Sequence, residues 1–204
     1  MKTTGIILAG GKSSRMGTNK ALLTIEGKTV IERIVESLEQ MVDHIIIVTN
    51  HFSDYEFLQL PMVEDKQKDM GPLAGIEAGL SASNTEKNLI VACDMPFISI
   101  DLGKYLLTLL DHYQAAVPEI DGQLHPLFAA YRKQIVPRVA QSLSEKQLRI
   151  RQLLHTIHVK IVINEELTAQ GISTEHIYFF NMNHPNEYHQ AMDLIKTKGG
   201  GSES

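Results

Sequence analysis

The chain has 204 residues, of which 43% are apolar and 21% charged, an ordinary globular composition that excludes a disordered or fibrous protein. A net charge of −5 provides no basic field to hold a nucleic-acid backbone, although a few local cations can still bind a small polyanion. The single cysteine, Cys93, excludes an internal disulfide, and no run approaches the roughly 20 apolar residues of a membrane span, so we expect a cytoplasmic protein that binds neither nucleic acid nor membrane.

Short apolar runs rich in Ile and Val alternate along the chain with amphipathic stretches. This alternation predicts an α/β fold with a mainly parallel sheet covered by helices. Because the runs themselves do not alternate between apolar and polar residues, we expect strands that are buried on both faces. The expected strands are Thr4–Ala9, His44–Thr49, Asn88–Cys93, Ala115–Pro118 and Val159–Ile163.

Amphipathic stretches between these strands predict the helices. Thr29 and Glu32 form a capping-box pattern at the start of a helix over Val30–Met41. Further helices are expected at Leu73–Ala82, Leu102–Tyr113, Gln134–Leu143 and Asn186–Lys196. No internal repeat or convincing linker interrupts the pattern, so we expect a single domain over residues 1–198, with a disordered Gly/Ser-rich tail at 199–204.

A segment dense in glycine and cations follows the first expected strand: Leu8-Ala-Gly-Gly-Lys-Ser-Ser-Arg-Met-Gly-Thr-Asn-Lys20. In parallel α/β sheets, ligands bind beyond the carboxyl ends of the strands, so this segment is well placed. Glycine lets backbone N–H groups approach a phosphate closely, while Arg15 and Lys20 supply positive charge. We interpret the segment as a phosphate-binding loop; the alternative is a tight turn with solvated cations.

Two common phosphate loops do not fit this segment. A Walker loop ending at Gly11-Lys12-Ser13 requires glycine at position 6, where Ile6 stands. The dinucleotide fingerprint requires a residue between its first two glycines, but Gly10 and Gly11 are adjacent. The segment is therefore a third kind of loop.

The spacing Leu-Ala-Gly-Gly, three residues, Arg-Met-Gly, two residues, Lys resembles the signature loop of the molybdopterin nucleotidyltransferases, in particular the molybdenum cofactor guanylyltransferases. Sugar-nucleotide pyrophosphorylases carry a related loop, usually with Gly-Thr-Arg-Leu and a later Pro-Lys, which this sequence lacks. The resemblance covers five segments in order, from Leu8 to about Tyr188. It implies a loop that lines the nucleotide with Leu8, Ala9, Gly10 and Gly11 and contacts its phosphates with Arg15 and Lys20.

The family resemblance also implies a fold and a reaction. The fold would be a Rossmann-like three-layer αβα sandwich with a mostly parallel central sheet, similar to the nucleotide-diphospho-sugar transferases. The reaction would transfer GMP from GTP to molybdopterin or Mo-molybdopterin with Mg²⁺ as cofactor, forming the guanine dinucleotide cofactor and releasing pyrophosphate. Other cofactor-biosynthesis or recipient proteins are further expected partners.

Asp94 stands where a buried strand is expected to end, in the run Cys93-Asp94-Met95-Pro96. Mg²⁺ that accompanies a triphosphate usually takes one or two carboxylates together with phosphate oxygens and waters. From the spacing alone, Asp94 could equally cap the helix after Pro96 or form a turn with Met95 and Pro96. The resemblance favours Asp94 as the metal ligand and as a contact of the nucleotide phosphates.

The acidic pair Glu64-Asp65 precedes Gly71-Pro-Leu-Ala-Gly75, which opens an expected helix. A helix N-terminus with two glycines suits polar ligand groups. By resemblance, Asp65 contacts the nucleotide and the turn at Gly71 shapes the base or ribose pocket; the alternative for Asp65 is a solvated loop acid near two lysines. Asn50, after the second expected strand, is a weaker candidate for a hydrogen bond to the base.

Two segments of the second half resemble the parts of the family that face the acceptor. His125 precedes a proline in a loop that enters an irregular strand, and it is a candidate for a pterin phosphate or else a turn residue. Arg149 and Arg151 lie in an expected short basic helix and are candidates to orient an anion, although a solvated helix face explains them nearly as well.

The run Phe179-Phe-Asn-Met-Asn-His-Pro185 predicts a strand that ends in two asparagines before the last helix. Asn183 or His184 would cap that helix, with Pro185 in its first turn. The resembled family has Asn-x-Asn-Thr-Pro here, which implies that Asn181 and Asn183 lie near the metal and the reacting phosphates. His184 departs from the usual Thr or Ser, which puts the cap in doubt but not the asparagines.

Three other functions fit parts of the sequence. The cytidylyltransferase for the same cofactor has a very similar first loop, and the Cys-Asp-Met-Pro and Phe-Asn-Met-Asn segments favour the guanylyl branch by resemblance. Nucleotidyl transfer to a sugar phosphate or an alditol phosphate is the second. A regulatory module that binds nucleotide without turnover is the third, but such a module could lose Arg15, Asp94 or the asparagines, and all are present.

Overall fold

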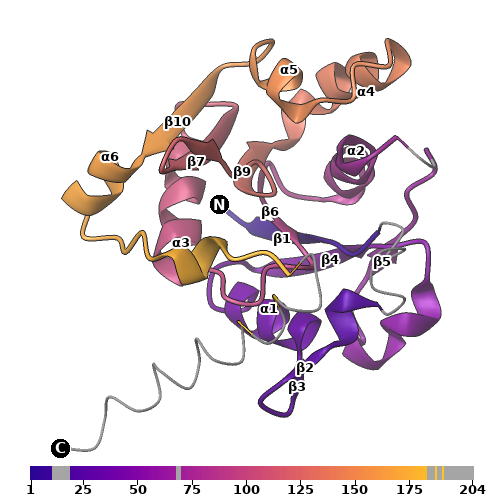
Figure 1. Cartoon of the computed structure of the whole chain (residues 1–204). Coiled ribbons are helices and arrows are strands. Elements are labelled where there is room, and N and C mark those ends of the chain that lie inside the picture. Colours follow the sequence, from indigo (N-terminus) through magenta and orange to yellow (C-terminus); the bar gives the residue numbers. More distant parts are fainter. Residues whose placement is uncertain (11–18, 68–69, 183–186, 188–189, 191–204) are drawn as a thin grey trace, which may run out of the picture.

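The computed structural model describes residues 1–10, 19–67, 70–182, 187 and 190 (Figure 1). Its main element is an eight-stranded sheet in the order β10-β7-β9-β6-β1-β4-β5, with β8 paired to β7 outside this path. Its strands are β1 (Thr3–Leu8), β4 (His44–Val48), β5 (Met62–Val63), β6 (Lys87–Ala92), β7 (Ala115–Ile120), β8 (Gln123–Leu124), β9 (Phe128–Arg132) and β10 (Val159–Ile163). A separate small sheet joins β2 (Thr24–Ile25) to β3 (Lys28–Thr29).

Most strand pairs of the main sheet are parallel. β1 pairs in parallel with β4 and β6, β4 with β5, and β7 with β10. β9 runs antiparallel to its neighbours β6 and β7, and β8 runs antiparallel to β7. The predicted mostly parallel sheet is confirmed, and β9 forms from the region expected to be an irregular strand after His125.

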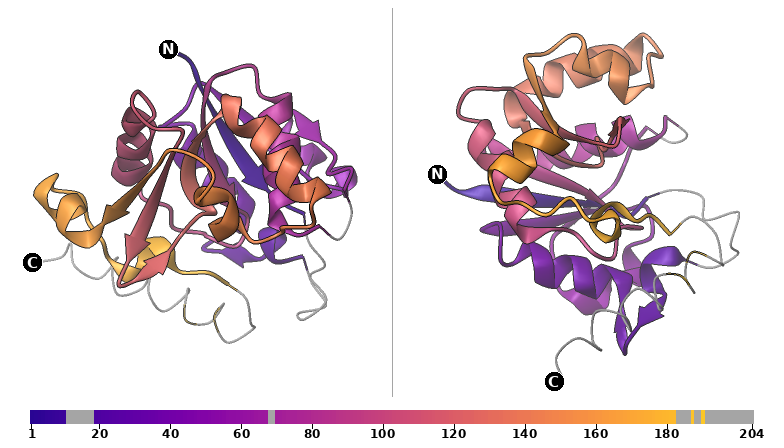
Figure 2. Two further views of the ribbon diagram at one scale, coloured as in Figure 1. Left: turned by 90° about the horizontal axis from the view of Figure 1, so that it is seen from above. Right: turned by 60° about the vertical axis from the view of Figure 1, so that its left-hand side comes forward.

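Helices cover both faces of the sheet (Figures 1 and 2). On one face lie α1 (Val30–Leu38), α3 (Ile100–Leu109) and α6 (Asn164–Ala169); on the other lie α2 (Pro72–Ala82), α4 (Val136–Ser144) and α5 (Ile150–Leu154). Adjacent residues of β1 divide between the two layers, since Ile7 packs with α1 and Ile6 with α2. Because both faces are covered, the strands need no polar side. The predicted three-layer αβα fold is therefore confirmed.

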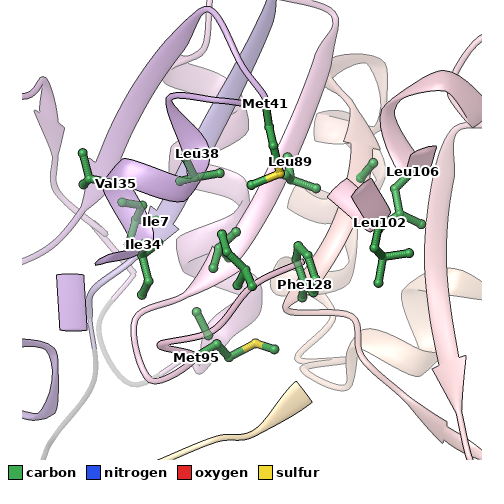
Figure 3. Close-up of a cluster of buried hydrophobic side chains, with 14 of the residues drawn as sticks. Ile7, Ile34, Val35, Leu38, Met41, Leu89, Met95, Leu102, Leu106 and Phe128 are labelled. Atoms are coloured by element: carbon green, nitrogen blue, oxygen red, sulfur yellow. The ribbon is translucent and has the colours of Figure 1, made fainter. Parts of the chain in front are cut away.

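Apolar side chains from α1, α3 and the sheet meet in one core layer (Figure 3). Removing one such side chain from water contributes roughly 1.5–3 kcal/mol to folding. The fully buried members labelled in the figure are Ile34 and Leu38 of α1, Leu102 and Leu106 of α3, and Ile7, Leu89 and Phe128 of the sheet. The sheet residues among them come from β1, β6 and β9, so the same packing fixes the ends of these strands.

The helix starts follow local capping chemistry. The predicted capping box of α1 is present: the Glu32 N–H donates to Thr29 Oγ1 at 3.3 Å, and the Thr29 N–H donates to Glu32 Oε2 at 2.7 Å. α3 begins at Ile100, before the expected start, because Ser99 Oγ accepts a hydrogen bond from the Leu102 N–H at 3.3 Å.

Other boundaries differ from the expected ones for local reasons. The stretch expected to form one helix over Gln134–Leu143 divides into a 3-10 turn and α4, since Pro137 lacks an N–H and suits the first turn of a helix. The helix expected to reach Tyr113 ends at Leu109, before the chain turns into β7. The 3-10 helices are η1 (Lys20–Leu22), η2 (Phe52–Asp54), η3 (Glu56–Leu58), η4 (Lys133–Ile135) and η5 (His176–Phe179).

The prediction of a strand that ends at the asparagines is wrong. The chain forms η5 instead, and Phe180 continues with extended backbone outside the sheet. Ile177, Phe179 and Met182 are buried by side-chain packing against the rest of the fold. A short apolar run has the same composition whether pairing or packing buries it, which explains the error.

Within the described residues, none of the helices is long and apolar enough to cross a membrane. The expected last helix, Asn186–Lys196, lies outside the described residues apart from Glu187 and Gln190, and so does the expected tail at 199–204.

Replacing Gly79 of α2 by alanine should destabilise the protein. A Cβ at this position would lie 2.5 Å from Ile6 Cγ2 and 3.1 Å from Val48 Cγ2, so α2 would have to move away from the sheet. Overpacking costs about 1–3 kcal/mol and exceeds the gain of roughly 1 kcal/mol in helix propensity. Urea unfolding of Gly79→Ala should show this loss, whereas Ser81→Ala on the exposed side of α2 should change the free energy of unfolding by less than about 0.5 kcal/mol.

Candidate functional site

The carboxyl ends of four strands form one row, which we call the carboxyl edge. Leu8 of β1 is paired with Val48 of β4 on one side and with Ala92 of β6 on the other, and Val48 is paired with Val63 of β5. In α/β sheets, ligands bind at this edge. The predicted site residues that follow these strands are Ala9 and Gly10 after β1, Asp65 after β5, and Asp94 after β6; Asn50 follows β4.

The hydrogen-bond ladder continues just beyond the strands. The Ala9 N–H donates to the Val48 carbonyl oxygen at 2.9 Å, and the Cys93 N–H donates to the Leu8 carbonyl oxygen at 3.1 Å. The side chain of Leu8 is buried in the core beneath α2, so only its backbone is near the edge. The sheet thus holds the start of the glycine-rich segment rigidly.

The far end of the glycine-rich segment returns toward Asp94. Lys20 begins η1 and is half-buried. Burial raises the pKa of the Asp94 carboxyl and of the Cys93 thiol, and the charge of Lys20 opposes part of this increase in both. The structure therefore brings together two predicted site residues, Lys20 and Asp94. The predicted residues Gly11 and Arg15 lie outside the described part of the chain.

Asp94 is held in a turn with one oxygen that makes no hydrogen bond. The cap of α3 is Ser99, so the interpretation of Asp94 as the cap of that helix is wrong. Atom Oδ1 of Asp94 is buried and has no hydrogen-bond partner among the described residues. Burial raises the pKa of this carboxyl above its ordinary value, and the opposing effect of Lys20 is smaller. A buried, unpaired carboxylate oxygen costs stability unless a ligand completes it.

This oxygen is the feature that fits a metal ion. Mg²⁺ binds few protein ligands and takes its other oxygens from phosphates and water, so one carboxylate at the phosphate end of a nucleotide site suffices. Among the residues that the structure describes, no three His, Cys, Asp or Glu side chains gather as a complete metal cage. Asp94 therefore fits a metal that is shared with a bound triphosphate.

Asp65 lies in a structured turn rather than in a freely solvated loop. Its backbone N–H donates to Asn50 Oδ1 at 3.1 Å, and its carboxylate Oδ1 accepts from the Gln67 N–H at 2.9 Å. Partial burial raises the pKa of the Asp65 carboxyl. Asn50, a weaker candidate for a hydrogen bond to the base, uses its side-chain oxygen to link the ends of β4 and β5, and its contact with the base stays a prediction.

Gly71 occupies a backbone conformation that favours glycine. It precedes α2 as the N-cap residue with φ of 68°, and Pro72 follows in the first turn of the helix. No described atom lies within 4 Å of a Cβ built on Gly71, so the turn needs this glycine for its backbone angle rather than for space. α2 packs against β5, the strand that precedes Asp65.

His125 and the asparagine segment meet on the other side of Asp94. The ring of His125 packs against the ring of Phe179, with centroids 4.6 Å apart, and burial lowers the pKa of the imidazole. The Met182 N–H donates to the carbonyl oxygen of Asp94 at 2.9 Å, which brings Asn181 beside the end of β6. His125 and Asp94 thus contact the same segment, which contains Asn181, while the predicted site residue Asn183 lies outside the described residues.

Arg149 and Arg151 are both exposed at the start of α5. Their guanidinium groups make no hydrogen bond or ion pair with other described residues. α5 packs through Ile150, Leu153 and Leu154 into the layer that contains α2 and α4. The role of the two arginines in acceptor binding stays a prediction.

Three residues of this region have no site role predicted from the sequence. Phe179 supports His125, and Tyr55 and Asn19 connect the two ends of the glycine-rich segment. Tyr55 belongs to the connection between β4 and β5, far from the segment in sequence. Only the position of Asn19 directly before Lys20 could have drawn attention to it.

Asp94→Asn should raise the free energy of unfolding of the ligand-free protein at pH 7. The variant removes a charge whose pKa is raised by burial in the folded state, so the charged form destabilises the fold at neutral pH. The advantage over wild type should shrink as the pH falls toward the ordinary pKa of aspartate, about 3.9, because protonation then neutralises the wild-type carboxyl. Chemical denaturation across this pH range checks the effect, and an equal gain in exposed Asp101→Asn would contradict it.

The model of the MobA-like NTP transferase domain family matches residues 5–161. A "Probable molybdenum cofactor guanylyltransferase" of Carboxydothermus hydrogenoformans is 36% identical over 195 residues, covering 96% of this chain and 98% of that protein. A protein of the same name from Pelotomaculum thermopropionicum is 35% identical over 198 residues, covering 97% of this chain and 93% of that protein.

A solved structure agrees with the fold. The crystal structure of molybdopterin-guanine dinucleotide biosynthesis protein A from Archaeoglobus fulgidus matches with a TM-score of 0.81 at 24% identity, covering 95% of this chain and 99% of that chain. The match of the family model extends from β1 to β10 and contains Lys20, Asp65 and Asp94. The chain therefore belongs to the MobA-like NTP transferase family.

Proposed function

We propose that the chain transfers GMP from GTP to molybdopterin or Mo-molybdopterin, forming the molybdopterin guanine dinucleotide cofactor and releasing pyrophosphate. Two relatives that match nearly the full length of the chain bear the name of this activity. The observation that carries the chemistry is the buried, unpartnered Oδ1 of Asp94 at the carboxyl edge, within the electrostatic influence of Lys20. Such a site suits a metal-bound triphosphate better than a neutral ligand.

The reaction requires no covalent intermediate on the protein. An oxygen of the terminal phosphate of the acceptor forms a bond to the α-phosphorus of GTP. The bond between the α-phosphorus and the oxygen that bridges to the β-phosphorus breaks, and pyrophosphate leaves with that oxygen. The work of the protein is then to position the two phosphates and to stabilise the charge on the leaving group.

In this proposal, each residue at the carboxyl edge has one task. Asp94 would hold Mg²⁺, which when bound would neutralise charge on the phosphate oxygens. Lys20 and Arg15 would bind the phosphates that leave, while the backbone of Ala9, Gly10 and Gly11 would line the nucleotide.

The base and the acceptor would lie on opposite sides of the phosphates. Asp65 and the turn at Gly71 would contact the base or ribose. His125, Arg149 and Arg151 would bind the acceptor, as the family resemblance of their segments implies. Asn181 and Asn183 would lie between the acceptor and the metal. The neutral His125 ring favoured by burial can donate one hydrogen bond to a phosphate oxygen without adding charge.

We further infer that the reaction takes place in the cytoplasm, because a chain with a single cysteine fits a reducing compartment. A protein that supplies molybdopterin or receives the finished dinucleotide would be the natural partner, since the cofactor is labile.

Calorimetric titration with GTP, CTP, ATP and UTP, each with and without Mg²⁺, tests the nucleotide part of the proposal. We expect selective binding of GTP, strengthened by Mg²⁺, followed by formation of the guanine dinucleotide when molybdopterin is added. A preference for CTP would move the chain to cytidylyl transfer. Binding without turnover in the presence of molybdopterin would favour a regulatory module.

Lys20→Met and Asp94→Asn should each lower kcat/KM for guanylyl transfer by about 10²–10³, the usual cost of removing one group that stabilises a transition state. Exposed Lys104→Met and Asp101→Asn on α3 remove the same charges elsewhere and should leave the rate within about twofold. Full activity in either site variant would remove that residue from the mechanism.

A further inference from the structure

The two ends of the glycine-rich segment are joined through one buried hydroxyl group. Tyr55 lies between η2 and η3 and is 1% exposed, with its ring in the same core layer as α1. Its hydroxyl accepts a hydrogen bond from Asn19 Nδ2 at 3.0 Å, and its one proton can be donated to Asn19 Oδ1 at 3.2 Å or to the carbonyl oxygen of Ala9 at 3.5 Å. Tyr55 therefore contacts Ala9, directly after β1, and Asn19, directly before Lys20.

The orientation of the Asn19 amide is determined by its other partners. Asn19 Oδ1 accepts from the Ala21 N–H at 3.2 Å and caps η1, and Nδ2 also donates to Asp54 Oδ2 at 3.0 Å. With Oδ1 occupied by a backbone donor, Nδ2 must face Asp54 and the Tyr55 hydroxyl. Every polar atom of the Asn19 side chain is thus used within this cluster.

The backbone of η1 transmits this arrangement to Lys20. Lys20 is the first residue of η1, the Leu22 N–H donates to the carbonyl oxygen of Asn19 at 3.0 Å, and Ala21 is fully buried. Moving Asn19 would therefore move the start of η1 and with it the ammonium group whose charge acts on Asp94.

We propose that Tyr55 is a positioning residue for the nucleotide site: through Asn19, its hydroxyl fixes Lys20 relative to the end of β1 and so prepares the site for a triphosphate. This inference rests on the proposed function for the identity of the nucleotide. The phenol does not touch the reacting atoms. Burial raises the pKa of Tyr55 to about 12, so the hydroxyl keeps its proton throughout the working pH range.

Tyr55→Phe removes the hydroxyl and keeps the ring, so the core stays filled. The matched control is Tyr105→Phe. It removes a hydroxyl of α3 that donates to Glu166 of α6 at 2.8 Å, away from the glycine-rich segment. Loss of one hydrogen bond of this kind should weaken GTP binding about 3- to 10-fold in Tyr55→Phe and less than about twofold in Tyr105→Phe. Wild-type affinity in Tyr55→Phe would overturn the proposal.

A double-mutant cycle separates positioning of Lys20 from a general structural effect. If Tyr55 acts through Lys20, Tyr55→Phe should weaken GTP binding less than about twofold in the Lys20→Met background. An equal loss in both backgrounds would overturn the proposal, because a purely structural defect would act independently of Lys20. Unfolding in urea, measured on every variant, confirms that each is folded during the titration.

A second readout needs no nucleotide. It therefore distinguishes failure of the positioning role of Tyr55 from failure of the proposed function. Trypsin cleavage after Lys20, followed by mass spectrometry on the ligand-free protein, reports opening at η1. We expect cleavage about 3- to 10-fold faster in Tyr55→Phe than in Tyr105→Phe. Equal cleavage rates would overturn the positioning role of Tyr55. If Tyr55→Phe is cleaved faster but the wild-type protein binds no GTP, only the proposed function would be overturned.

Discussion

The position of β1 between β4 and β6 is the constraint on which the site depends. Pairing of Leu8 with Val48 and with Ala92 places three strand ends in one row, and the ladder continues to Ala9 and Cys93. Both neighbouring pairs are parallel, so the segments that leave these strands must all emerge at the same edge. A one-residue slip of β1 would reverse which of Ile6 and Ile7 faces each helical layer, and the packed core therefore fixes the register.

The carboxyl edge combines rigid backbone with unfavourable electrostatics. The carboxyl of Asp94 is buried with one oxygen lacking a partner, and Lys20 offsets only part of the cost of burying its charge. Elsewhere in the core, local preference and packing agree, as in the capping box of α1. A conflict confined to one strand end is typical of a functional site, where a bound ligand supplies the missing interaction.

Residues around the end of β6 come from distant parts of the chain. The Met182 N–H donates to the Asp94 carbonyl oxygen, and in the same segment Phe179 of η5 packs against His125, which lies between β8 and β9. On the other side, Asn50 ties β4 to the turn at Asp65, and Tyr55 joins Asn19 to Ala9. Residues that the motifs do not assign to the site therefore hold the predicted site residues in place.

The sequence by itself determined the α/β class, the five main strands, the capping box of α1 and the location of Asp94 directly after a strand. These features are local, since periodicity, capping chemistry and the position of a residue in its segment are all present in a short stretch. The tertiary structure decided what depends on distant partners: the antiparallel β9, the packing of Phe179 outside the sheet, the use of Asn50 as a tie, and the contact of Tyr55 with Asn19. Whether an apolar run is buried by pairing or by packing, and which hydroxyl meets which amide, depends on contacts between residues far apart in the chain. No local pattern contains that information.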